Sequence, residues 1–156
     1  MKKLICLTIN DKKYDAVVEP NQTLVDVLRY QLGLTGTKKG CELGDCGSCT
    51  VLMDGKPVNS CLVLAVQAVD HDIRTIEGIE TDKGLHPVQQ AFVDHQGIQC
   101  GFCSSGMILS AKSLLDRNPK PSESEIRTAI SGNLCRCTGY QKIIESVQAA
   151  SEVLSK

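Results

Sequence analysis

The sequence predicts an α+β fold, with strands in the first half of the chain and helices in the second. Three observations support this: short β-rich runs separated by turns up to residue 77, helical spacing of apolar residues after residue 85, and nine cysteines divided between the halves. With 156 residues, 42% of them hydrophobic, the chain is long enough for two small cores. We therefore assign residues 1–77 to a first domain and residues 85–156 to a second, joined by a polar linker at residues 78–84.

In the first domain, two predicted hairpins flank one helix in the order ββαββ, which fits a small open sheet that holds a single helix. A further run closes the sheet. The predicted strands are residues 4–9, 14–18, 50–53, 56–59 and 73–77, and the helix follows residues 20–23. Residues 62–69 are ambiguous between strand and short helix, and the glycine-rich residues 36–49 are expected to be irregular.

Local signals set the turns and ends of these elements. Asp54-Gly55 suits a type I′ turn between two strands. Thr23, with Asp26 three residues later, resembles a capping box that opens the helix, and Gly33 ends it.

The second domain has apolar residues at helical spacing in four segments, and four helices in two hairpins suggest a small bundle. Pro87 suits a helix start, and Ser122 with Glu125 forms a capping box. The expected helices lie between residues 87 and 97, 107 and 118, 122 and 132, and 141 and 154.

Composition excludes several function classes. The formal net charge is −1, from 17 basic and 18 acidic residues, so the chain lacks the basic surface that nucleic acid requires. The sequence contains no apolar run long enough to span a membrane. Lys2 and Lys3 are followed by a short apolar run that Asp11 interrupts, so we expect no signal segment and a cytoplasmic protein. In that reducing compartment, dense cysteine indicates metal binding or redox chemistry.

Three cysteines of the first domain follow the plant-type [2Fe-2S] spacing, and a fourth lies closer to them than it does in free plant ferredoxins. Cys41, Cys46 and Cys49 form the pattern C-x4-C-x2-C, and Cys61 follows after eleven intervening residues. Gly40, Gly44 and Gly47 allow tight turns that aim backbone N–H groups at an anionic cluster. Lys38 and Lys39 lie close by and are interpreted as a solvated pair.

Four more cysteines lie at predicted helix ends in the second domain: Cys100, Cys103, Cys135 and Cys137. The separation of 31 residues between Cys103 and Cys135 is too long for common zinc ribbons, and C-x-C is an uncommon zinc pairing. Structural zinc remains an alternative for the first quartet, and disulfides are disfavoured by the compartment. The ninth, Cys6, is interpreted as a small buried hydrophobe in the first strand. The histidines His71, His86 and His95 lie outside these clusters.

Three ordered motifs, at residues 39–51, 99–103 and 132–140, resemble the iron–sulfur subunit of the molybdenum hydroxylases, the xanthine dehydrogenase and aldehyde oxidase family. The resemblance covers essentially the whole chain. It implies a ferredoxin-like β-grasp domain followed by a four-helix-bundle domain, each holding one [2Fe-2S] cluster. The short interval from Cys49 to Cys61 is also the one usual in this family.

The resemblance further implies a place in a larger enzyme. A separate large subunit would hold molybdopterin and hydroxylate the substrate, for which an N-heterocycle such as nicotinate or a purine is weakly favoured. Electrons would then pass through the helical-domain cluster to the ferredoxin-like cluster, and from there usually to FAD on another subunit, or else to an external acceptor. Gln99 and Cys137 would contact the molybdopterin, and Arg136 would either offset cluster charge or be a surface guanidinium with no such role.

Three hypotheses remain from the sequence: an electron-transfer subunit of a molybdenum hydroxylase, a freestanding two-cluster electron carrier, and a zinc-stabilised interaction module. In the first two, no residue of this chain acts as acid, base or nucleophile. Its task is to shorten electron-transfer distances and to set cluster potentials.

Overall fold

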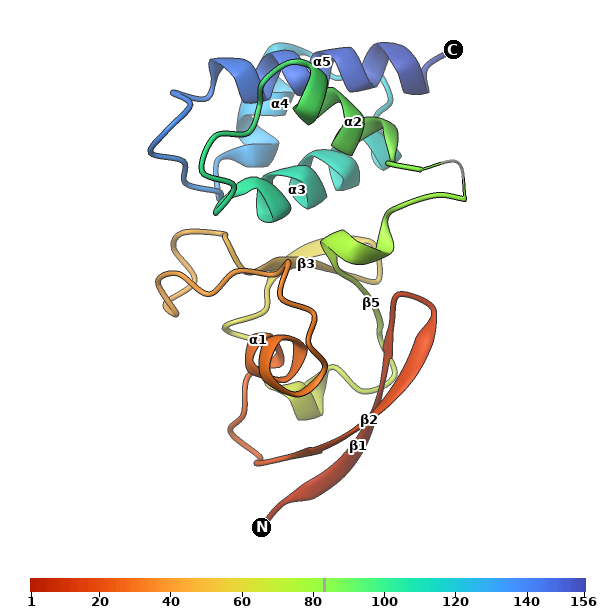
Figure 1. Cartoon of the computed structure of the whole chain (residues 1–156), viewed down its shortest axis with the longest axis vertical. Coiled ribbons are helices and arrows are strands. Elements are labelled where there is room, and N and C mark those ends of the chain that lie inside the picture. The colour runs from red at the N-terminus through yellow and green to blue at the C-terminus, as the bar shows by residue number, and fades with distance from the viewer. Residues whose placement is uncertain (83) are drawn as a thin grey trace.

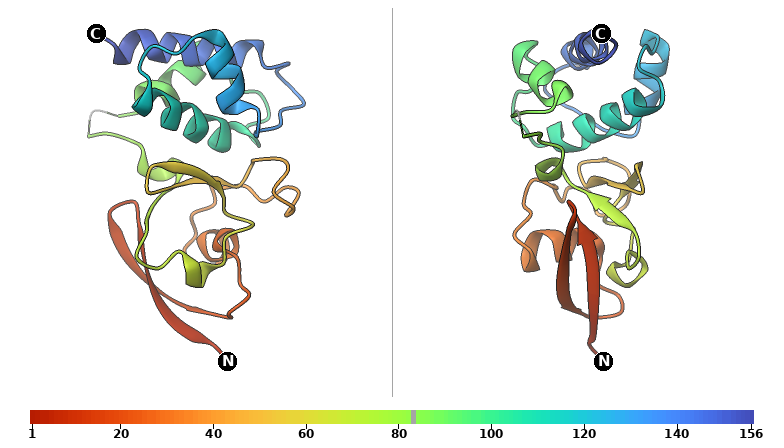
Figure 2. Two further views of the ribbon diagram at one scale, coloured as in Figure 1. Left: turned by 180° about the vertical axis from the view of Figure 1, so that it is seen from behind. Right: turned by 90° about the vertical axis from the view of Figure 1, so that its right-hand side faces the viewer.

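A computed structural model describes residues 1–82 and 84–156, and it places the strands at one end of the molecule and four helices at the other (Figure 1). The N-terminus lies at the free end of the sheet and the C-terminus lies in the helical layer. The side and rear views show the same two layers, with the helices stacked on one end of the strand-rich half (Figure 2). The predicted α+β class is confirmed.

Five strands form one mixed sheet in the order β2-β1-β5-β3-β4. The parallel pair is β1 with β5, and the remaining neighbours are antiparallel. The strands are β1 (Lys3–Ile9), β2 (Lys12–Val18), β3 (Thr50–Met53), β4 (Lys56–Asn59) and β5 (Asp72–Arg74). The predicted type I′ turn at Asp54-Gly55 has positive φ at both positions, 51° and 76°, as that turn requires.

The helix of the first half starts at α1 (Leu24–Asp26) and continues as a π-helical segment, η1 (Val27–Gln31). It packs Leu24, Val27 and Leu28, all fully buried, into the core beneath the sheet. The predicted capping box does not form, because the Thr23 hydroxyl donates to the Asp26 carboxylate at 2.8 Å and not to a backbone group. This helix start is therefore weaker than the sequence suggested.

Two further predictions in the first half need correction. Cys6 is exposed, because the inward face of β1 carries the fully buried Leu7 and Ile9, and Cys6 lies on the opposite face. The closing strand β5 ends at Arg74, short of the predicted residue 77. Asn10 exchanges two side-chain hydrogen bonds with Thr75 at this point, and the chain then enters a 3-10 turn, η3 (Ile76–Gly78). Residues 62–69 contain the short 3-10 turn η2 (Ala65–Gln67) and an isolated antiparallel bridge from Leu64 to Thr23.

The four expected helices of the second half are present, and they pack around one buried apolar cluster that includes Phe92, Met107 and Ile143. They are α2 (Pro87–Asp94), α3 (Ser104–Arg117), α4 (Glu123–Ile130) and α5 (Gln141–Leu154). The capping box of α4 forms as predicted: Glu125 N–H donates to the Ser122 hydroxyl at 3.3 Å, and Ser122 N–H donates to the Glu125 carboxylate at 2.7 Å. No helix in the described part of the chain is both long and apolar enough to cross a membrane.

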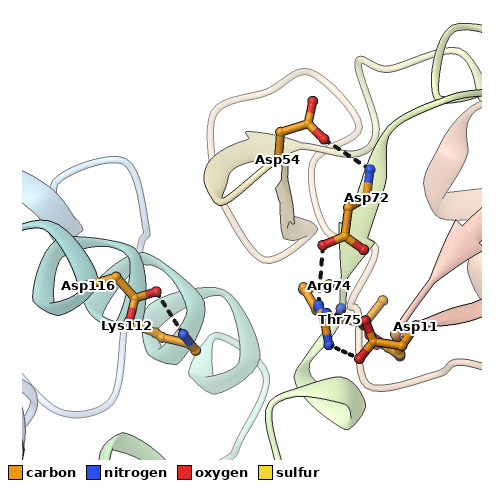
Figure 3. Close-up of polar contacts among 8 residues, drawn as sticks. Asp11, Asp54, Asp72, Arg74, Thr75, Lys112 and Asp116 are labelled. Carbon is orange, nitrogen blue, oxygen red and sulfur yellow. Dashed lines mark hydrogen bonds and ion pairs between the residues drawn. The ribbon is translucent and has the colours of Figure 1, made fainter.

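Helix α3 lies along β3 and connects the halves (Figures 1 and 2). Leu52 of β3 joins the helical core, and the Ser113 hydroxyl donates to the carbonyl of Gly55 at 2.9 Å. Nearby, Arg74 of β5 forms ion pairs with Asp72 and with Asp11 of the β1–β2 turn, opposite α3 (Figure 3). The halves therefore share apolar and polar contacts beyond the linker.

Candidate metal centres

The loop between the first helix and β3 holds three cysteines of the first quartet, and its backbone surrounds Cys41 with donors. The backbone N–H groups of Leu43, Asp45 and Cys46 each lie 3.3 Å from the sulfur of Cys41. These bonds lower the pKa of the Cys41 thiol to about 7. The Cys41 N–H in turn donates to the Cys46 sulfur at 3.4 Å. The loop thus stabilises thiolate, which is the form that binds iron.

Glycine is needed where this loop passes close to its neighbours. Gly44 has a φ of +84°, and a Cβ there would lie 2.4 Å from the Leu62 side chain. A Cβ on Gly40 would lie 2.9 Å from the Cys46 sulfur. A larger residue at Gly40 would push against the Cys46 sulfur, and one at Gly44 would be strained by the positive φ and would have to move the Leu62 side chain.

Two cysteines of the first quartet are buried together against Val25. Cys49 precedes β3 and Cys61 follows β4, so the second hairpin brings them together. Burial, followed by the contact with Cys49, raises the pKa of Cys61 to about 11. Ser60 fixes this neighbourhood because its hydroxyl donates to the Cys49 carbonyl at 2.6 Å. A buried thiol such as Cys61 is costly to ionise, and a bound metal would supply the positive charge that offsets this cost.

The second quartet lies at the ends of α3 and α5. Cys103 is buried at the start of α3, and burial followed by contact with Cys135 raises its pKa to about 12. Burial alone would also raise the pKa of Cys135, but bonds from the Thr138 hydroxyl and N–H outweigh burial and lower it. Cys100 and Cys137 are exposed, and their mutual contact raises the pKa of Cys137. The 14-residue helix α3 begins at this quartet, so its N-terminal dipole favours an anionic group there.

The eight cysteines are therefore arranged as four interacting pairs, namely Cys41 with Cys46, Cys49 with Cys61, Cys103 with Cys135, and Cys100 with Cys137. A [2Fe-2S] cluster takes two thiolates on each of its two irons, so two pairs per cluster fit this donor set. Among the described residues, no three His, Cys, Asp or Glu side chains meet around a single metal position.

Both quartets border one cavity of about 270 Å³ between the halves of the chain. Cys41 and Cys46 line it from the first half, and all four cysteines of the second quartet line it from the other. The backbones also meet here, since Leu134 N–H donates to the Cys46 carbonyl at 2.9 Å. The path from Cys46 to Cys135 therefore consists of this hydrogen bond and the residue Leu134.

A buried asparagine joins the same two loops. Asn133 is 3% exposed, and its amide donates to the Gly47 carbonyl at 2.9 Å and to the Thr50 hydroxyl at 3.1 Å. Its carbonyl accepts the Ser110 hydroxyl at 2.7 Å. A Cβ on Gly47 would lie 2.2 Å from the carbonyl oxygen of Gly132, so the two loops touch backbone to backbone.

The other residues singled out in the sequence lie around these centres. Gln99 and Arg136 are exposed beside the second quartet. Lys39 is paired with Asp26 and Glu42, both at 2.9 Å, and is therefore not the solvated residue that we expected. His71 and His86 have partners of their own: His71 Nδ1 contacts Asp54 at 2.5 Å, and His86 caps α2 by accepting Val88 N–H at 3.2 Å.

Sequence reasoning gave no role to three residues that the structure places in contact with the cysteine loops: Asn133, Thr138 and Tyr140. Each lies in the motif at residues 132–140, where the cysteines dominate the pattern. The signal that could have identified them is the presence of side-chain donors directly beside ligand-type cysteines.

Comparison with known proteins agrees with this geometry. Residues 7–80 match the family described as "2Fe-2S iron-sulfur cluster binding domain", and residues 75–148 match the "[2Fe-2S] binding domain". The chain is 49% identical over 151 residues to the nicotinate dehydrogenase small FeS subunit of Eubacterium barkeri, covering 97% of this chain and 96% of that protein.

Two solved structures have the same fold. A chain of quinoline 2-oxidoreductase from Pseudomonas putida 86 superposes with a TM-score of 0.94 at 49% identity, covering 99% of this chain and 96% of that one. The aldehyde oxidoreductase of Desulfovibrio gigas superposes with a TM-score of 0.92 at 45% identity, covering 98% of this chain but 17% of that longer one. With two 2Fe-2S domains and relatives of this kind over nearly its full length, the chain belongs to the small iron–sulfur subunits of the molybdenum hydroxylases.

Proposed function

We propose that this chain passes electrons through two [2Fe-2S] clusters, from a molybdopterin site on a large subunit toward FAD on another subunit. The first cluster is held by Cys41, Cys46, Cys49 and Cys61, and the second by Cys100, Cys103, Cys135 and Cys137. When bound, each cluster takes up and releases one electron at a time. The chain itself orients the ligand sulfurs, donates hydrogen bonds to them and keeps the two centres close together.

The observation that carries this proposal is that both quartets border one cavity and are joined by a backbone hydrogen bond. Cys46 and Leu134 are 2.9 Å apart at that bond, and Leu134 directly precedes Cys135. Electron transfer between two cofactors requires this closeness, whereas two independent structural metal sites do not. The sheet also supports the ferredoxin-like β-grasp assignment of the first domain, because β1 and β5 pair in parallel around one helix.

The exposed side of the second quartet supports docking on the molybdenum subunit. Cys100, Cys137 and Gln99 are exposed there, and two apolar side chains stand beside them: Phe102, 46% exposed, and Leu134, 55% exposed. Exposed apolar groups around a cofactor edge are typical of a partner interface. We assign Gln99 and Cys137 to contact with the molybdopterin in the assembled enzyme.

The exposed side of the first quartet supports the opposite contact. Leu43 is 72% exposed and Leu62 is 60% exposed beside this loop, and we assign them to the FAD-binding subunit. For the substrate of the whole enzyme we propose an N-heterocycle, because the names of two relatives specify nicotinate and quinoline.

The first experiment is metal analysis with EPR of the dithionite-reduced protein. We expect about four irons and four sulfides per chain and two distinguishable signals. The variant Cys61→Ser should remove or alter one signal only, while the matched control Cys6→Ser should leave both unchanged, since Cys6 is exposed on β1. A colourless protein that contains zinc would contradict the proposal.

The second experiment is native purification with identification of co-purifying chains. We expect a molybdenum-containing subunit and a flavin-containing subunit, and hydroxylation of nicotinate or quinoline by the complex. A chain that is always recovered alone, in cells that hydroxylate these compounds normally, would instead indicate a freestanding carrier.

A further inference from the structure

The Thr138 side chain lies directly against a ligand-type sulfur of the second quartet. Its hydroxyl oxygen is 3.2 Å from the Cys135 sulfur, and its backbone N–H is 3.5 Å from the same atom. Among the described residues, the other hydrogen bonds to the sulfurs of the eight ligand-type cysteines come from backbone N–H groups or from another cysteine. Thr138 thus adds a side-chain hydroxyl to one centre.

The neighbouring contacts orient this hydroxyl. Tyr140 N–H donates to the Thr138 oxygen at 3.1 Å, which uses the acceptor side of the hydroxyl and leaves its proton for the sulfur. The phenol oxygen of Tyr140 accepts Cys135 N–H at 2.9 Å, so Tyr140 holds both residues in place. Tyr140 itself is packed against the helical core at the start of α5 and adopts a φ of +69°. The contacts of Tyr140 therefore hold the loop that positions the Thr138 hydroxyl.

We propose that Thr138 is a positioning residue that raises the reduction potential of the second cluster by donating its hydroxyl proton to the Cys135 sulfur. This inference rests on the proposed function, in which Cys135 is an iron ligand. One-electron reduction adds negative charge to the cluster and to its ligand sulfurs, so a hydrogen bond to sulfur stabilises the reduced form more than the oxidised form. The effect makes the second cluster the better acceptor for an electron from the partner subunit.

Because Thr138 contacts a ligand of the second cluster, its hydroxyl raises the reduction potential of that cluster relative to the first. A higher potential at the second cluster favours its reduction and leaves less driving force for the onward step to the first cluster. The Thr138 hydroxyl thereby sets how one electron divides between the two clusters. The backbone N–H bonds to the Cys41 sulfur raise the reduction potential of the first cluster in the same way. Because the donors are backbone groups, side-chain substitutions in that loop leave these bonds in place.

The test is a potentiometric EPR titration of both clusters in the holoenzyme. Thr138→Val removes the hydroxyl at nearly constant shape, and Thr138→Ala removes it without the branched side chain. Both should shift the electron toward the first cluster about three- to tenfold, where tenfold is about 59 mV for one electron. Thr138→Ser keeps the hydroxyl and should restore the wild-type division. Thr128→Val removes a matched hydroxyl that donates to the Ser124 carbonyl on the exposed face of α4, and it should leave both cluster potentials unchanged.

The possible results distinguish a failure of the proposed function from a failure of the role assigned to Thr138. If wild-type protein lacks a second EPR signal, the proposed function fails. If both signals are present and Thr138→Val and Thr138→Ala titrate as wild type, or if both clusters shift equally, the role of Thr138 is wrong and the proposed function stands.

Discussion

Replacing Asn133 with alanine should uncouple the two halves of the molecule more than any exposed substitution. The change removes three side-chain hydrogen bonds, to Gly47, Thr50 and Ser110. The Gly47 carbonyl keeps the hydroxyl and N–H of Thr50 as donors, at 2.6 and 3.1 Å, so it stays satisfied. The Ser110 hydroxyl loses its acceptor in a buried site, where an unmatched polar group is costly.

The expected loss of stability follows from the number of hydrogen bonds removed. At about 0.5–1.5 kcal/mol for each hydrogen bond, the expected loss in free energy of unfolding is about 3 kcal/mol. With a urea m-value of about 2 kcal/mol per molar, the denaturation midpoint should fall by about 1.5 M. The assay is urea denaturation of the cluster-loaded protein followed by circular dichroism.

The matched control for this prediction is Asn118→Ala. Asn118 also uses its side chain in two hydrogen bonds, to Glu125 and Lys120, but both are exposed. Its loss should cost less than about 0.5 kcal/mol. If Asn133→Ala shifts the midpoint no more than Asn118→Ala does, the buried amide does not hold the halves together and our reasoning is refuted.

Two more pairs of substitutions test local features by the same urea midpoints. Gly47→Ala should destabilise the protein far more than Gly55→Ala. Both glycines have positive φ, which costs about 1–2 kcal/mol for alanine, but only at Gly47 would the new Cβ strike the backbone of Gly132, at 2.2 Å. Equal effects would show that the two loops do not touch. Ser122→Ala should cost about 1 kcal/mol and Thr23→Ala about a few tenths, because only Ser122 caps backbone; a larger loss at Thr23 would contradict the assignment of the caps.

Features that depend on neighbours in sequence could be predicted well. The Asp54-Gly55 turn and the Ser122 capping box have the predicted conformations, because turn and cap chemistry acts within a few residues. The spacing of the cysteines likewise indicated two groups of four. Thr23 shows the limit of such local prediction. The residue pattern of a capping box is present, but the Thr23 hydroxyl donates to the Asp26 carboxylate and does not cap the backbone.

Features that depend on distant partners could not be predicted. Cys6 alternates with Leu7 along β1, and the sequence did not show which face met the core. Asn133 contacts residues 83 and 86 positions away, so its role appears only once the loops meet. Which cysteines pair is also a tertiary property, since Cys49 meets Cys61 through a hairpin, whereas Cys103 meets Cys135 across a helical pair.

The position of β5 in the sheet has a consequence for how the protein folds as it is synthesised. β5 is the last strand in the chain but the central one in the order β2-β1-β5-β3-β4, and it pairs Thr8 with Asp72. The two hairpins can form early from local contacts, but they cannot join until residue 74 is available to bridge them. All four cysteines of the first quartet therefore leave the ribosome before the sheet that positions them can close.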